Sequence, residues 1–272
     1  HILFFRLGDF YEMFFDDAVL VSRELELTLT GRDCGLDERA PMCGIPYHAS
    51  EVYIKRLIEN GHKVAICEQL TDPKDAKGGI VERDVIRIVT PGTLTESTLL
   101  DESKNNYLCA AFSSDDVCAV CFADISTGEV HLFRKSGKDI QNEIINELSR
   151  FEPVEILFND RFLDYRQVTD FIRNKMNSSV QMLDSECFDT DMKKSVVLKQ
   201  FNVSELCEIG LNEDTAEASC VCGLFDYISD TQKSDISYKV TLFPKLHSSG
   251  AHSKCNTCLR KKCDTKIFAY AV

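Results

Sequence analysis

Membrane-spanning and leader segments are missing from this sequence of 272 residues. No apolar run approaches the ~20 residues that a transmembrane helix needs. A basic and then apolar leader is also missing, because the chain opens on HILFFRLGDF, which predicts a strand already in progress. We therefore expect no membrane partner, and we expect residues upstream of His1. The sequence also has no internal repeat and no low-complexity tract.

Basic side chains are in deficit. The chain has 31 Lys and Arg against 44 Asp and Glu, and its formal net charge is −13. Residues 96–238 hold most of the acid, whereas residues 239–272 carry seven basic side chains and one acidic one. Because Lys and Arg that neutralise phosphates supply much of the affinity of proteins for DNA, this composition argues against a protein that binds DNA alone. A role on DNA would need phosphate contacts from other parts of an assembly.

Disulfide bonding is not indicated, although the chain has 13 cysteines. They are scattered, and most lie inside apolar runs such as YLCAAF and VCAVCF, where cysteine acts as a small hydrophobic residue. An odd number of cysteines in a long, carboxylate-rich chain does not fit a secreted disulfide framework. The sequence therefore predicts a reducing, cytoplasmic location.

Residues 1–95 have the pattern of a compact α/β unit. Asp9 can cap a helix, and Glu12 three residues later completes a capping-box pattern. A second helix is expected after Ser50, because its apolar residues fall on one face. We expect strands over residues 2–8, 25–30, 63–70 and 82–90, helices over about 9–23 and 50–61, and loops or turns over 31–49 and 73–79.

A polar linker over 96–106 leads to a second unit over 107–238. Three apolar runs separated by the turn sequences SSDD and STG predict a meander, and alternating helices and strands follow. This order indicates a mixed sheet with helices packed on it. We expect strands over residues 107–112, 117–125, 128–134, 154–158 and 180–184, and helices over 138–150, 162–174, 190–200 and 213–229.

The stretch GDFYEMFFDDA near the start combines four aromatic rings with four carboxylates. If this stretch forms a helix, the rings fall on faces that can pack in the core, and Glu12 only caps the helix. This is the simpler interpretation of the pattern. The alternative is an apolar wedge, Phe10, that enters a minor groove and kinks a weakly stacked base step. A carboxylate beside such a wedge would favour a mispaired base that can donate a hydrogen bond to it, and would disfavour a normal duplex.

Five motifs in residues 1–95 carry a resemblance to a known family: GDFYE, LELTLTGRD, GIPYHA, VAICEQ and IRIVTPGT. This part of the chain resembles the amino-terminal part of the MutS family of bacterial DNA mismatch repair proteins. The resemblance implies a small mixed-sheet mismatch-recognition domain. It also implies that Phe10 is the wedge, that Glu12 contacts the displaced base, and that Arg32 lies near the DNA backbone. Mismatched double-stranded DNA would then be the partner.

Residues 107–238 are similar, more loosely, to the connector domain of that family, which has a ribonuclease-H-like fold. The motifs are FADISTGEV, FEPVEILF and GLFDYISDTQKSDIS. Such a fold leaves one enzymatic alternative open, a metal-dependent nuclease centred on Asp124. A two-metal nuclease needs several convergent carboxylates, and the sequence offers no convincing partner for Asp124. A carboxylate that ends a strand and caps the STG turn is the simpler interpretation.

Residues 239–272 leave the family pattern, and we interpret them as a divergent tail that is unstructured or comes from a shifted reading frame. The tail has one CxxC pair at Cys255 and Cys258, with His252 and Cys263 nearby, which is a weak zinc signal. We expect no bound metal and no evolved fold in these residues.

The chain has no G-x-x-x-x-G-K-[ST] phosphate loop. Full-length members of the family use ATP and Mg²⁺, act with a homodimer partner and bind downstream repair proteins. We expect no ATP hydrolysis, no catalytic residue and no cofactor in this chain. A truncated remnant with both folds and no repair role is therefore a further alternative to mismatch recognition.

Overall fold

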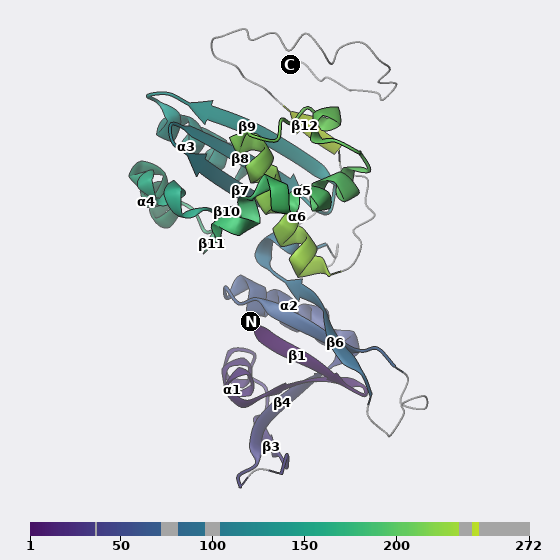
Figure 1. The fold of residues 1–272 in the computed structure, drawn as a ribbon. Coiled ribbons are helices and arrows are strands. Elements are labelled where there is room, and N and C mark those ends of the chain that lie inside the picture. The colour runs from purple at the N-terminus through teal and green to yellow at the C-terminus, as the bar shows by residue number, and fades with distance from the viewer. Residues whose placement is uncertain (36, 72–80, 96–103, 234–240, 245–272) are drawn as a thin grey trace.

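The computed structural model describes residues 1–35, 37–71, 81–95, 104–233 and 241–244. These residues form two six-stranded mixed sheets, one in each half of the molecule (Figure 1). The expected mixed α/β class is confirmed. No helix among the described residues is long and apolar enough to cross a membrane.

The first sheet has the strand order β3-β4-β2-β1-β5-β6. β1 and β5 run parallel, and every other neighbouring pair is antiparallel. The predicted strands over 2–8, 63–70 and 82–90 are confirmed as β1, β5 and β6. The strand bounds are β1 Ile2–Leu7, β2 Phe10–Phe14, β3 Thr30–Arg32, β4 Ala40–Pro46, β5 Val64–Gln69 and β6 Arg83–Val89.

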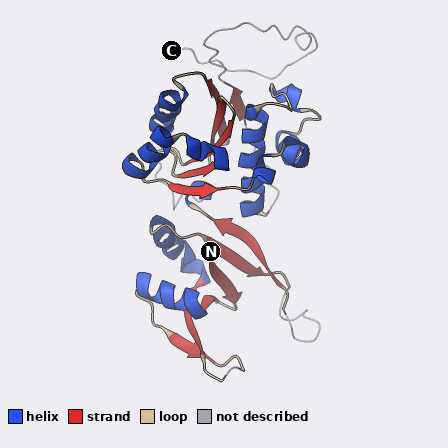
Figure 2. Cartoon of the chain, turned by 60° about the vertical axis from the view of Figure 1, so that its left-hand side comes forward, coloured by secondary structure: helices blue, strands red, loops and turns tan. Residues whose placement is uncertain are grey.

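Two helices, α1 Phe15–Glu24 and α2 Ser50–Glu59, cover one face of this sheet (Figure 2). Alternate strand residues meet both helices in one core that includes Phe4, Met13 and Leu57. Each fully buried side chain of this size contributes roughly 1.5–3 kcal/mol through the hydrophobic effect. The alternation leaves a second set of side chains on the opposite face of the sheet.

The predicted helix start at Asp9 is wrong, because Phe10–Phe14 form a strand. Tertiary pairing overrides the local capping pattern, since this segment lies between β1 and β4 and pairs with both. The helix begins at Phe15, whose φ of 53° turns the chain out of the strand. Glu12 therefore caps nothing, and no side chain caps α1.

The expectations for residues 25–30 and 31–49 are also wrong. The segment Leu25–Leu29 is not a strand, and the predicted loop contains β4, whose sequence APMCGIP has two prolines and a glycine. Such residues usually favour turns, but β4 is held by pairing with β2 on one side and β3 on the other. The second predicted helix is confirmed as α2.

The second sheet has the order β11-β10-β7-β8-β9-β12. Helices cover both of its faces (Figure 2), with α3 and α4 in one core and α5 and α6 in the other. The predicted meander and the predicted helices are confirmed, with ends shifted by a few residues. The bounds are β7 Tyr107–Ser114, β8 Val117–Asp124, β9 Glu129–Ser136, β10 Glu155–Phe158, β11 Ser179–Met182, α3 Ile140–Phe151, α4 Arg166–Lys175, α5 Thr190–Phe201 and α6 Ala216–Gln232.

The tail contributes one strand, β12 Thr241–Pro244, which pairs in parallel with β9. For these four residues the expectation of an unstructured tail is wrong, because their backbone extends the second sheet. The rest of the tail, including the CxxC pair, lies outside the described residues. So do the predicted turn over 73–79 and most of the linker over 96–106.

Gly223 in α6 is required by a close approach to Phe188. An ideal Cβ at position 223 would lie 2.4 Å from two ring atoms of Phe188, which is 1% exposed. Alanine is favoured over glycine in a helix by about 1 kcal/mol, but overpacking a core costs about 1–3 kcal/mol. We expect Gly223→Ala to lower the free energy of unfolding by about 1–2 kcal/mol in urea denaturation. The exposed Ser229→Ala change in the same helix is the control, and a Gly223→Ala chain as stable as that control would contradict the expectation.

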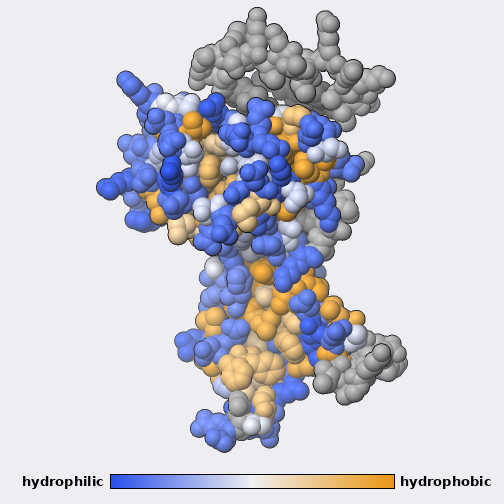
Figure 3. Space-filling model, viewed as in Figure 1, coloured by the Kyte–Doolittle hydropathy of each residue, from blue (hydrophilic) through white to orange (hydrophobic). Residues whose placement is uncertain are grey.

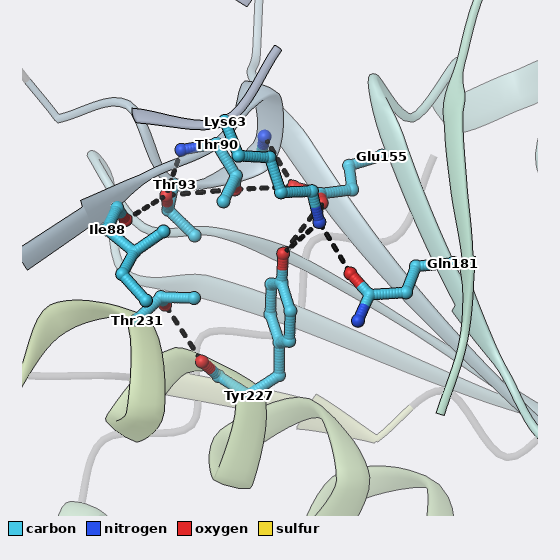
Figure 4. Close-up of polar contacts among 9 residues, drawn as sticks. Lys63, Ile88, Thr90, Thr93, Glu155, Gln181, Tyr227 and Thr231 are labelled. Carbon is cyan, nitrogen blue, oxygen red and sulfur yellow. Dashed lines mark hydrogen bonds and ion pairs between the residues drawn. The ribbon is translucent and has the colours of Figure 1, made fainter. Parts of the chain in front are cut away.

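The junction between the two units is built around Glu155, whose side chain is completely buried (Figure 4). Lys63, just before β5, places its Nζ 2.8 Å from Glu155 Oε1, 2.8 Å from the Tyr227 hydroxyl and 2.5 Å from Gln181 Oε1. The Tyr227 hydroxyl donates to Glu155 Oε1 at 2.7 Å. The Thr90 hydroxyl donates to Glu155 Oε2 at 2.6 Å. The junction thus joins both sheets and α6 through one buried carboxylate.

Candidate nucleic-acid interface

The candidate site lies on the face of the first sheet that the helices leave open. In β2, Tyr11 and Met13 point into the core, so Phe10, Glu12 and Phe14 share the opposite face. The Phe10 side chain is 47% exposed. A ring packed wholly inside the core could not reach a groove, so this exposure is the first requirement for a wedge.

Residues behind β2 hold it firmly in the sheet. The Tyr11 hydroxyl donates to the Glu68 carboxylate, and Arg6 lies 3.6 Å from the same carboxylate. Burial, with the hydrogen bond to Glu68, raises the pKa of Tyr11, so its hydroxyl stays a donor. Phe10 pairs with Leu7 on one side and with Pro46 on the other. The exposed ring is therefore presented from a paired central strand, with little backbone freedom.

Arg32 belongs to the same face, although it comes from the edge strand β3. Its guanidinium forms an ion pair with the Glu12 carboxylate and lies 6.0 Å from the Phe14 ring. The Arg32 side chain is 44% exposed and that of Glu12 is 17% exposed. The three residues that the sequence singled out are thus on one face, and two of them are in direct contact.

Gly44 in β4 keeps the space beside Glu12 open. It pairs directly with Glu12, and a Cβ at this position would lie 3.5 Å from Glu12 Cγ. Arg32 reaches across β4 to Glu12 from the level of Ala40, with which it pairs. A larger side chain at position 44 would stand on the same face as Glu12 and Arg32.

Tyr47 and Arg6 form a neighbouring aromatic and basic pair that the sequence did not single out. The Arg6 guanidinium lies 3.5 Å from the centre of the Tyr47 ring, and Tyr47 is 41% exposed. The Tyr47 backbone N–H donates to the Asp9 carbonyl at 3.0 Å, which places the backbone of Tyr47 beside the start of β2. The only available signal was the GIPYHA motif, and nothing in it indicates a contact with a residue 41 positions earlier.

Apolar side chains gather on the visible surface of the first unit, whereas that of the second unit is mostly hydrophilic (Figure 3). Phe10 belongs to a larger set of exposed apolar residues in the first unit, among them Leu3, Phe15, Tyr47 and Ile86. An exposed ring can stack on a base, the carboxylate beside it can accept a hydrogen bond, and the guanidinium can pair with a phosphate.

Asp124 has a structural role at the end of β8. Its Oδ1 accepts hydrogen bonds from the Ser126 hydroxyl at 2.6 Å and the Ser126 N–H at 2.9 Å, and its Oδ2 accepts from the Asn106 N–H at 3.2 Å. No group of three or more metal-ligating side chains gathers anywhere in the described part of the chain. The nuclease alternative stays a prediction without a supporting observation.

Two families of protein domains match the chain. MutS domain I matches residues 1–98, and MutS domain II matches residues 106–240. Among curated proteins, the chain is 43% identical over 237 residues to the DNA mismatch repair protein MutS of Ruminiclostridium cellulolyticum, covering 87% of this chain and 27% of that protein. It is 47% identical over 238 residues to the protein of that name from Clostridium botulinum strain Hall, covering 87% of this chain and 24% of that protein.

These matches define the chain as two consecutive MutS domains. The chain belongs to the MutS family and holds its domains I and II. It spans about a quarter of the length of the curated relatives that it matches.

Proposed function

We propose that the open face of the first sheet recognises mispaired or unpaired bases in double-stranded DNA. Phe10 inserts at the mispair from the minor groove, and Glu12 accepts a hydrogen bond from the displaced base. Arg32 lies near the DNA backbone. The half-exposed Phe10 ring beside Glu12, on the one face without helices, is the observation that carries this proposal.

The physical basis is differential deformation of the duplex. A wedge costs less where stacking is already weakened, so a mispaired step admits Phe10 more readily than a paired one. A displaced base can donate to Glu12, whereas a paired base offers no donor and leaves the carboxylate near phosphates. The second unit then carries communication to further domains and to protein partners.

Binding by this chain alone is expected to be weak. Its net charge is −13, with 31 Lys and Arg against 44 Asp and Glu. Phosphate contacts dominate the affinity of most DNA-binding proteins, and the rest of a MutS protein would supply them. Tight, mismatch-selective binding at moderate salt would contradict this expectation.

Phe10→Ala tests the proposal. Two labelled duplexes that differ in a single mispair are titrated with the full chain at low salt, and fluorescence anisotropy gives the ratio of the two affinities. Because stacking of a base on an aromatic ring contributes about 1–3 kcal/mol, we expect this ratio to fall about tenfold in Phe10→Ala.

Phe15→Ala is the matched control. Phe15 is 53% exposed and opens α1, the helix on the other side of the sheet. We expect this variant to keep the ratio of the unmodified chain. Equal ratios for Phe10→Ala and Phe15→Ala would overturn the role of Phe10, and an unmodified chain without any preference would overturn the proposed function.

A further inference from the structure

The Glu12 carboxylate on the open face forms an ion pair. Its partner is Arg32, which lies on β3 and is separated from β2 by the whole of β4. Arg32 and Glu12 are 20 residues apart in sequence, and strand pairing alone brings them to the same face. No other ion pair to either side chain occurs within the described part of the chain.

The pair has two consequences in the protein without DNA. The guanidinium neutralises a carboxylate that would otherwise repel the phosphates of any duplex. It also occupies an oxygen of the group that would have to accept a hydrogen bond from a base. Glu12 can therefore accept a hydrogen bond from a base only if Arg32 shares the carboxylate or releases it.

We propose that Arg32 is a specificity-determining residue that holds Glu12 in an ion pair on a correctly paired duplex and yields it to a displaced base. This inference rests on the proposed function. It adds a role that is distinct from a contact between Arg32 and the backbone.

The exposure of the Arg32 side chain suits a pair that opens from the side of the guanidinium. Arg32 is 44% exposed, and an ion pair that water reaches is weak and screened by salt. A base that has lost its partner offers Glu12 a replacement donor in a site closed to water, where hydrogen bonds to a charged group are strong. The released guanidinium can then pair with a phosphate. Gly44, which pairs with Glu12, places no side chain beside it.

The two duplexes should respond differently when the pair is removed. On a paired duplex, Arg32→Gln leaves Glu12 as an unneutralised anion beside phosphates, so affinity falls. On a mispaired duplex the base still satisfies Glu12, and the lost phosphate contact is offset because no ion pair has to open. Removal of Arg32 is therefore expected to raise selectivity because it lowers the affinity for the paired duplex.

The test is a set of four full chains: unmodified, Glu12→Gln, Arg32→Gln and the double variant. Each is titrated with the paired and the mispaired duplex. We expect Arg32→Gln to weaken binding to the paired duplex about three- to fivefold, as for the loss of one partly exposed charge. We expect it to change binding to the mispaired duplex less than about twofold. In the Glu12→Gln background the same change should weaken both duplexes equally.

Two further variants separate charge from structure. Arg32→Lys keeps the charge and should restore most of the affinity for the paired duplex. Arg39→Gln removes an exposed arginine of the loop that leads into β4, and should affect both duplexes alike. Circular dichroism of each variant verifies its fold.

The outcomes are distinct. An equal loss on both duplexes in Arg32→Gln would show a phosphate contact only and would overturn the inference. If Arg32→Gln leaves the affinities for both duplexes unchanged, Arg32 has a structural role only, and this result would also overturn the inference. The proposed function itself fails on a different result, which is the absence of any preference for the mispaired duplex in the unmodified chain.

Discussion

Replacement of Glu155 by alanine is expected to lower the free energy of unfolding by about 3–5 kcal/mol. Its two carboxylate oxygens accept hydrogen bonds from the Lys63 ammonium, the Tyr227 and Thr90 hydroxyls and the Gly92 N–H. Alanine would leave all four donors without this acceptor. Each buried donor that loses its partner costs about 1–3 kcal/mol.

The burial of the donors decides the size of this effect. Thr90 is completely buried and Tyr227 is 8% exposed, so water cannot replace the lost carboxylate. Burial, followed by the charge of Glu155, raises the pKa of Tyr227, which keeps its hydroxyl protonated as a donor. Lys63 is 18% exposed and can recover part of its hydration. The loss is therefore large but stays within the range for one broken buried pair.

Urea denaturation followed by circular dichroism measures this effect, with Glu143→Ala as the control. Glu143 pairs with Lys135 at 3.7 Å, but its side chain is 42% exposed, so its removal should cost less than about 1 kcal/mol. Amide exchange should also quicken in β5 and β10, which the cluster joins. Equal unfolding midpoints for the Glu155→Ala and Glu143→Ala chains would show that the junction does not depend on this carboxylate.

Gly92→Val is expected to lower the free energy of unfolding by about 2–3 kcal/mol. A Cβ at position 92 would lie 2.8 Å from Leu108 Cδ1, which is closer than real Cβ atoms approach, and 3.1 Å from Glu155 Cβ, which is tighter than most real contacts. The backbone of Gly92 is not in the left-handed region, so the obstacle is space and not conformational strain. The valine would push the two units apart and weaken the Gly92 N–H bond of 3.0 Å to Glu155.

Gly44→Ala provides the comparison for Gly92→Val. Its Cβ would meet nothing closer than 3.4 Å, which is ordinary van der Waals contact. We expect the Gly44→Ala chain to unfold within about 0.5 kcal/mol of the unmodified chain. A Gly92→Val chain with the same stability would mean that the units do not approach as closely at position 92 as the structure indicates.

Local patterns predicted the elements whose own residues decide their form. The apolar face of α2 and the three apolar runs of the meander are strong local signals, and they meet little competition from distant segments. The prediction for Phe10–Phe14 was wrong because the local capping pattern at Asp9 and Glu12 favours a helix. Pairing of this segment with β1 and β4 makes it a strand instead.

At the candidate site, too, the sequence identified the residues but not the contacts between them. Phe10, Glu12 and Arg32 came from motif resemblance, and the structure places all three on one open face. The ion pair between Glu12 and Arg32 could not be predicted, because it depends on β4 lying between their strands, and β4 had been expected to be a loop. The Glu155 junction was missed for a similar reason, since Lys63 and Glu155 are 92 residues apart.

By itself the sequence determined the family, the mixed α/β class and the residues that deserve a test on DNA, because short motifs and local periodicity carry that information. Only the tertiary structure decided that Phe10–Phe14 is a strand, which of its side chains leave the core, and which charged group each carboxylate contacts. These properties depend on pairings between distant segments, whose free energy outweighs the local preference of any one of them.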